Sequence, residues 1–115
     1  MNPHKGEVAL MAGEKTYVLR LSINAIAEIE DLMGEGIEAI IRKTDRVGTL
    51  RAILWGALRE HHSELSLFDA GDIIGEIGAP AAGEKIGEAL KLAFPVPEGD
   101  ARPQIAAQGG TGRTS

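Results

Sequence analysis

The stretch that decides the fold is LRAILWGALREHH, residues 50–62. Apolar residues recur in it at helical spacing, namely at Leu50, Ile53, Leu54, Ala57 and Leu58. This pattern predicts an amphipathic helix whose apolar stripe faces the core of the domain. Thr44 or Asp45 is placed to cap its N-terminus, and we expect the helix to run to about His62.

The only tryptophan of the chain, Trp55, lies off this stripe. On a helical wheel it stands about 140° from the centre of the stripe, with Arg51 and Arg59 one turn to either side and His62 close by. A lone tryptophan in a small domain most often packs into the core. The alternative is a partner-binding patch made of Trp55, Arg51, Arg59 and His62, because tryptophan and arginine are enriched at binding hot spots.

The N-terminal part carries the pattern of a β-hairpin. Two short runs, residues 7–11 and 15–21, flank a turn that contains Gly13. In the second run Tyr17, Leu19 and Leu21 alternate with more polar residues, which is typical of a half-buried strand. A lone hairpin is marginally stable in water, so we expect its apolar face to lie on helices.

Four further helices are predicted from capping signals and apolar periodicity. Ser22 is a plausible N-cap of the first, with Leu21 and Ile26 placed as a hydrophobic staple. The apolar face of that helix comprises Ile23, Ile26, Ile29 and Met33, and Gly34 ends it. A short helix follows in residues 36–44.

Ser66 and Asp69 form a near capping box at the start of another helix, which ends at Gly78. Pro80 lies in the first turn of the last helix, where Ile86, Leu90 and Phe94 repeat at four-residue intervals. The glycines of GDIIGEIG and GEKIGEAL, residues 71–78 and 83–90, suggest close contacts between helices.

These elements predict an α+β fold, an N-terminal β-hairpin packed on a small bundle of four to five helices. We expect residues 1–94 to form a single domain, since 115 residues suffice for one core and not for two. Residues 95–115 contain prolines, glycines and small polar residues with little to bury, which predicts a flexible tail.

The composition argues against several classes of function. The chain has no cysteine, which excludes disulfides and thiolate metal sites. A net charge of −5 disfavours nucleic acid and anionic membranes. No apolar run approaches the roughly 20 residues that span a bilayer, so we expect a soluble, cytoplasmic protein.

Neither a metal site nor a catalytic or cofactor-binding site is predicted. His61 and His62 lie beside Glu60 and Glu64, but neighbouring helix positions point about 100° apart and no His-Glu-x-x-His spacing exists. We expect His61 to have a structural role near a helix end. The carboxylates fall on solvated helix faces, so we expect the protein not to be an enzyme.

The ordered segments GEVALMAGEKTYVLRLSINAIAEIEDLMG, LRAILWGALREHH and LSLFDAGDIIGEIG, followed by a helix ending LAFP, carry a resemblance. The chain resembles the gene transfer agent family of small proteins related to the tail assembly chaperones of long-tailed phages, over roughly residues 5–95. The resemblance implies a chaperone that binds the tape-measure protein during tail assembly in the bacterial host, with tail-tube subunits as further partners. A homo-oligomer is compatible with that role.

Two alternatives stay open. The closest is a structural component of the tail tube, against which the predicted helical content argues. The other is a small DNA-binding regulator, since residues 67–90 can be drawn as a helix-turn-helix. Its second helix, however, balances Lys85 and Lys91 with Glu84 and Glu88, a poor face for a major groove.

Overall fold

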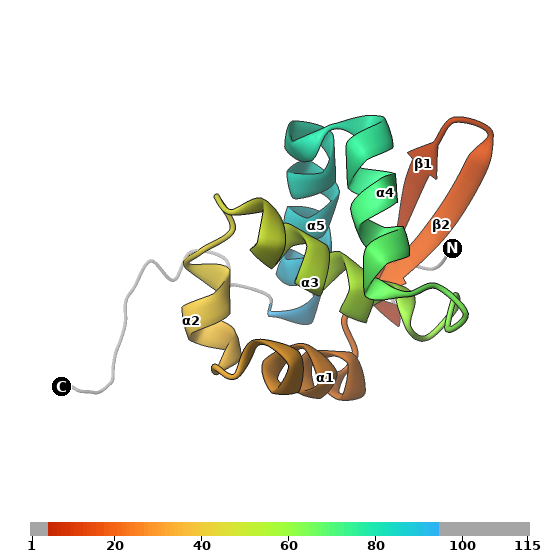
Figure 1. Ribbon diagram of the computed structural model, residues 1–115. Helices are drawn as coiled ribbons and strands as arrows, with labels where there is room; N and C mark the ends of the chain where they lie inside the picture. Colours follow the sequence, from red (N-terminus) through yellow and green to blue (C-terminus); the bar gives the residue numbers. More distant parts are fainter. Residues whose placement is uncertain (1–4, 95–115) are drawn as a thin grey trace, which may run out of the picture.

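The computed structural model describes residues 5–94, which form a two-stranded hairpin followed by five helices (Figure 1). This confirms the predicted α+β fold. The flexible tail predicted for residues 95–115 lies outside the described residues. No helix within the described range is both long and apolar enough to cross a membrane.

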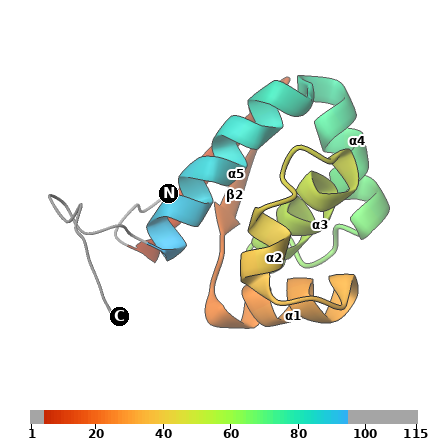
Figure 2. The ribbon, with the colours of Figure 1, turned by 90° about the vertical axis from the view of Figure 1, so that its left-hand side faces the viewer.

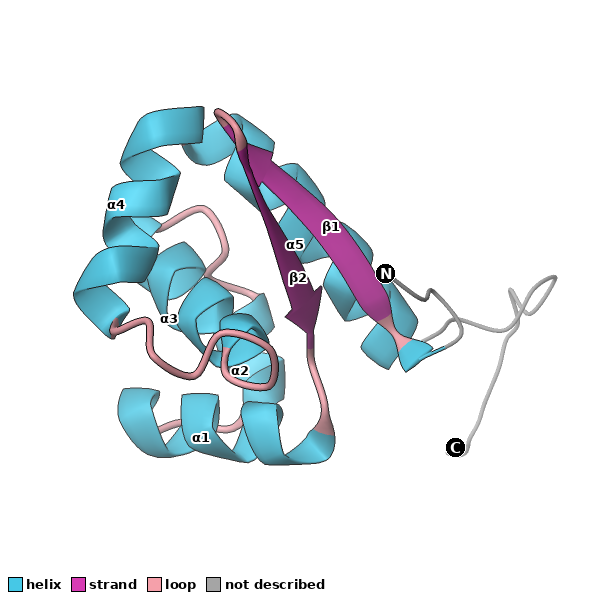
Figure 3. Ribbon diagram, turned by 90° about the vertical axis from the view of Figure 1, so that its right-hand side faces the viewer, coloured by secondary structure: helices cyan, strands magenta, loops and turns pink. Residues whose placement is uncertain are grey.

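The hairpin pairs β1 (Glu7–Ala12) with β2 (Lys15–Arg20) in antiparallel register, with Val8 opposite Leu19. Gly13 takes a positive φ of 64° in the connecting turn, a conformation that glycine adopts without steric cost. Val8, Leu10 and Leu19 are buried on one face. Figure 3 shows the hairpin lying against α5 (Ala79–Ala93), as expected for a strand pair that cannot stand alone.

Helix α1 (Ile23–Met33) begins and ends where the sequence predicts. The Ser22 hydroxyl accepts a hydrogen bond from the Ala25 N–H, and Gly34 ends the helix with a φ of 72°. Ile26 and Ile29 are buried as expected, but Ile23 is 80% exposed. The prediction that Ile23 faces the core is wrong, because it lies in the first turn, which no described element covers on that side.

Helix α2 (Ile37–Ile41) is short and is held by the end of α1. A carboxylate oxygen of Glu30 accepts a hydrogen bond of 2.7 Å from the Ile37 N–H. Glu30 therefore supplies the N-terminal acceptor that Gly36, at the N-cap position, lacks.

Helix α3 (Val47–Leu58) passes through the middle of the domain and contacts α1, α4, α5 and β2 (Figure 2). It is shorter than predicted. Arg46 occupies the N-cap position without a side-chain hydrogen bond, so neither Thr44 nor Asp45 caps the helix. Its C-terminus falls at Leu58 rather than near His62, because the following residues turn toward the hairpin.

Helix α4 (Leu67–Ile77) begins with a complete capping box. The Ser66 hydroxyl accepts from the Asp69 N–H at 3.0 Å, and the Asp69 carboxylate accepts from the Ser66 N–H at 2.9 Å. Gly78, with a φ of 92°, joins α4 directly to α5, and Pro80 lies in the first turn of α5 as predicted. The apolar stripe of α5 is buried at Ile86, whereas Phe94, at the C-cap, is 41% exposed.

The closest helix contact occurs at a glycine other than those predicted. Gly56 of α3 packs so tightly on Ile29 of α1 that a β-carbon would stand 2.3 Å from its Cγ1 atom. By contrast, a β-carbon at Gly75, Gly83 or Gly87 would meet no described atom within 4 Å. The expected close packing is therefore absent at these three positions, whereas Gly71 of the same stretch does lie close to Arg51 of α3, 3.1 Å from a β-carbon to Cδ.

Candidate partner-binding surface

Trp55 packs against the hydrophobic core with its ring only partly buried. The Arg59 guanidinium carbon lies 5.2 Å from the ring centroid, within the range of a cation–π interaction. Arg59 also forms an ion pair of 3.3 Å with Glu28 and donates a hydrogen bond to the Ser63 carbonyl oxygen. Trp55 and Arg59 are thus brought together as predicted, but both are already engaged within the domain.

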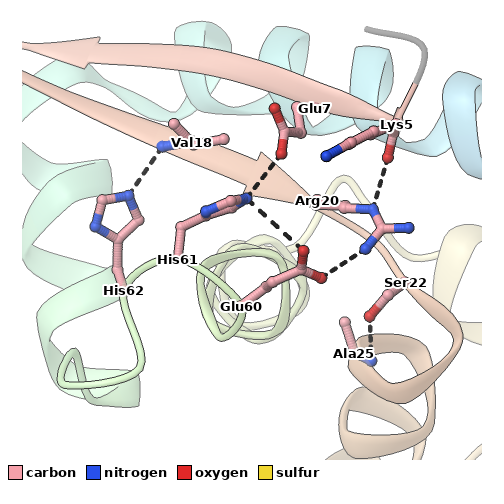
Figure 4. A network of polar contacts seen from close by, with 9 residues as sticks. All are labelled: Lys5, Glu7, Val18, Arg20, Ser22, Ala25, Glu60, His61 and His62. Carbon is pink, nitrogen blue, oxygen red and sulfur yellow. Dashed lines mark hydrogen bonds and ion pairs between the residues drawn. The ribbon is translucent and has the colours of Figure 1, made fainter. Parts of the chain in front are cut away.

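His62 faces the hairpin (Figure 4). Its Nε2 atom accepts a hydrogen bond of 3.0 Å from the Val18 N–H, which requires the neutral ring with its proton on Nδ1. The ring also meets Tyr17 edge to face, with centroids 5.3 Å apart. The contacts of His62 therefore tie the segment after α3 to the outer edge of β2.

Arg51, one turn before Trp55 on α3, lies against the surface of α4. A β-carbon at Gly71 would stand 3.1 Å from Cδ of Arg51, so the missing side chain leaves room for the arginine. The four residues predicted as one patch are thus distributed over three contacts: Trp55 with Arg59, His62 with the hairpin, and Arg51 with α4. Their role in partner binding stays a prediction.

Figure 4 shows a polar cluster between the hairpin and the segment after α3. His61 Nε2 lies 2.9 Å from a Glu7 carboxylate oxygen and 3.8 Å from a Glu60 oxygen, while Glu60 accepts a hydrogen bond of 2.7 Å from Arg20. One ligand atom each from Glu7, Glu60 and His61 lie within 4.8 Å of one another, a spacing that could hold a metal ion.

The sequence places His62 and Glu64 beside His61 and Glu60 as candidate ligands. In the structure, however, the third member of the cluster is Glu7, which is 54 residues away from His61 in the chain. The cluster has a structural explanation, since Glu7 is 9% exposed and the imidazole meets its carboxylate. His61 does have the structural contact that we expected, though beyond the helix end rather than within it.

A different surface carries exposed apolar side chains, which the sequence analysis did not single out. Phe68, Val47 and Leu32 are 74%, 59% and 46% exposed. Two neighbouring hollows of about 470 and 460 Å³ connect them, and Arg51 lines both. We call this the α3–α4 surface and define it by Leu32, Arg46, Val47, Arg51 and Phe68.

One signal in the sequence could have found this surface. Phe68 is the second residue of α4 and falls outside the buried stripe of Ala70, Ile73 and Ile74. Val47, by contrast, is in line with the apolar stripe of α3 by helical spacing, so its exposure follows from its place at the very start of the helix. Spacing alone therefore predicts the exposure of Phe68 but not that of Val47.

The described part of the chain is thus a helical domain with a short hairpin, polar contacts that serve its own packing, and exposed apolar side chains on the α3–α4 surface. A family model described as "Phage tail tube protein, GTA-gp10" matches residues 5–83. The chain belongs to this family of phage and gene transfer agent tail proteins. No curated protein and no solved structure matches it.

The family match corrects the expected function. The resemblance implied a tail assembly chaperone, whereas the matching family is described as a tail tube protein. The chaperone interpretation is therefore wrong, and the alternative of a tail tube component agrees with the match. The argument from helical content fails too, since the match covers α1 to α4 entirely as well as the hairpin.

Proposed function

We propose that this protein is a structural component of the tail tube of a phage-like particle, a gene transfer agent, and that it associates with tail-tube subunits. The observation that carries the proposal is the family match, which spans more than half of the chain and includes the hairpin and the first four helices.

The α3–α4 surface supports the proposal. Contiguous exposed apolar side chains are uncommon on monomeric proteins and mark sites of protein association. Here they are contributed by α1, α3 and α4, so the surface belongs to the folded domain and is presented on rigid elements.

The proposal includes three further expectations. The protein acts by binding and not as an enzyme, it assembles in the cytoplasm of the bacterial host, and it meets other tail proteins there. Contact with the tape-measure protein, a further expected partner, stays a prediction. A pull-down with separately expressed tube subunits and tape-measure protein tests which of the two is bound.

The decisive experiment asks whether the protein remains in finished particles. An epitope-tagged copy is expressed from its own locus, particles are purified by density gradient, and their proteins are quantified by mass spectrometry. We expect the protein in the particle fraction at many copies per tail, and we expect tails to be missing when its gene is deleted. A host cytoplasmic enzyme serves as the contamination control. Absence from purified particles would refute the proposal.

A further inference from the structure

We propose that the α3–α4 surface binds an apolar segment of a partner protein that carries carboxylates between its apolar side chains. The proposal concerns the chemistry of the partner. That the partner is another tail protein rests on the proposed function.

The apolar part of the surface is assembled from three elements. Leu32 belongs to the last turn of α1, Val47 begins α3 and Phe68 lies in the first turn of α4. The two hollows between them share Gly48 and Arg51 in their lining. A partner side chain that enters either hollow therefore comes close to Arg51.

The start of α3 adds hydrogen-bond donors to this surface. Its N-cap residue, Arg46, provides no side-chain acceptor, and the first turn contains no acidic residue. The Thr49 and Leu50 N–H groups bond to the Arg46 carbonyl oxygen, whereas within residues 5–94 the N–H groups of Val47 and Gly48 meet no acceptor. By comparison, α1 and α4 are capped by serines. The free donors and the helix dipole both favour a carboxylate at this point.

Arg51 provides an observation that is independent of the helix start. Its Nε atom is buried, and no acceptor in the described part of the chain bonds to it. Because that enclosed atom is out of a partner's reach, it is the partly exposed remainder of the guanidinium that can meet a carboxylate, the acceptor that an arginine binds most strongly. Neither Arg51 nor Arg46 has an ion pair among the described residues, and Asp72 is the one acid that lines the hollows there.

The charge of the surface complements an acidic occupant. The chain as a whole carries a net charge of −5, yet Arg46 and Arg51 outnumber Asp72 here. An acidic apolar segment pairs with the arginines and accepts hydrogen bonds from the free N–H groups of Val47 and Gly48. It also covers the exposed apolar side chains. Complementary charge at such a site speeds encounter and selects the partner.

The test uses a synthetic amphipathic peptide of about 14 residues, or four helical turns, in which leucines alternate with glutamates at helical spacing. Two matched peptides replace every glutamate by glutamine or by lysine. Binding is measured by fluorescence anisotropy and mapped by NMR. We expect the glutamate peptide to bind and to shift the amide signals of Val47 and Gly48. The glutamine peptide should bind about tenfold more weakly, because charge-assisted hydrogen bonds are lost.

Variants of the protein locate the site. R51Q and F68S should each weaken binding of the glutamate peptide about tenfold or more. I23S is the matched control, because Ile23 is also a highly exposed apolar residue but lies outside this surface. Urea unfolding of each variant confirms that it folds, and R46Q provides a second charge variant if R51Q is unstable.

Three outcomes would overturn the proposal. The lysine peptide could bind as tightly as the glutamate peptide, or the shifted amides could map away from the α3–α4 surface. Sedimentation could instead show that the protein self-associates through Phe68 and ignores the peptides, in which case a second copy is the occupant. Retention in purified particles is a separate measurement, so the proposed function can stand if this inference fails.

Discussion

Gly56 and Ile29 are in such close contact that residue 56 has no space for a β-carbon, which would stand 2.3 and 2.5 Å from two side-chain atoms of Ile29. Ile29 is fully buried, and Gly56 lies in the last turn of the central helix. The distance between α1 and α3 is therefore set by the absence of a side chain at one position.

We expect G56A to destabilise the domain by about 1–3 kcal/mol, since an added methyl group must displace Ile29 in a packed core. The matched control is G87A in α5, where a β-carbon meets no described atom within 4 Å. Because alanine is the better helix former, G87A should stabilise by about 0.5–1 kcal/mol. Urea unfolding measures both. Equal stability of the two variants would show that α1 moves to accommodate the added methyl group without a cost in stability.

Trp55 should contribute more to stability than to binding. Its ring is partly buried against the core, so W55A should cost about 2 kcal/mol, less than the ~3–5 kcal/mol typical of a fully buried aromatic residue. Removing the cation–π contact with R59Q should cost about 0.5–1 kcal/mol, against no loss for R42Q on the exposed surface. A W55A variant with wild-type stability and reduced affinity for tail subunits would instead support the partner-binding prediction.

His62 should protect a single amide of the hairpin. In H62A the Val18 N–H loses its acceptor, so its hydrogen exchange should accelerate and stability should fall by about 1–2 kcal/mol. Exchange followed by NMR checks this residue by residue. H61A is the control, because His61 contacts Glu7 and should leave Val18 protected. Unchanged exchange at Val18 in H62A would mean that another group shields it.

The cluster of Glu7, Glu60 and His61 should bind no stoichiometric zinc. Glu60 is already paired with Arg20 at 2.7 Å, so a cation would have to displace a guanidinium and lie beside its charge. We expect protein purified without added metal to contain no zinc by elemental analysis, and H61Q to leave that result unchanged. R20Q tests the reason, since it removes the competing charge and should raise zinc affinity. One zinc per wild-type chain would disprove the expectation.

The features that the sequence predicted correctly depend on neighbours in the chain. The Ser22 cap, the Gly34 stop and the capping box of Ser66 with Asp69 each involve residues within four positions of one another, so residue type and spacing suffice. The alternation in β2 predicted the hairpin for the same reason.

What the sequence missed depends on contacts between distant segments. The fit of Gly56 on Ile29 and the pairing of Glu7 with His61 arise only when α1, α3 and the hairpin are placed. The end of α3 also depends on a distant segment. Helical periodicity in the sequence continues to His61, but contacts with the hairpin end the helix earlier. The exposed apolar surface was missed because apolar residues in helices were assigned to the core.

The contact of His62 with Val18 also limits how the hairpin can pair with other chains. The Val18 N–H points away from β1, so His62 occupies the outer edge of β2, while in the described residues no strand pairs with the other edge of β1. An open strand edge is a template for further strands, and fibres grow when both edges are open. The imidazole at Val18 blocks one position on the outer edge of β2, so a further strand adds more readily at β1 than at β2. Unequal edges of this kind disfavour the repeated strand addition on which amyloid-like stacking depends.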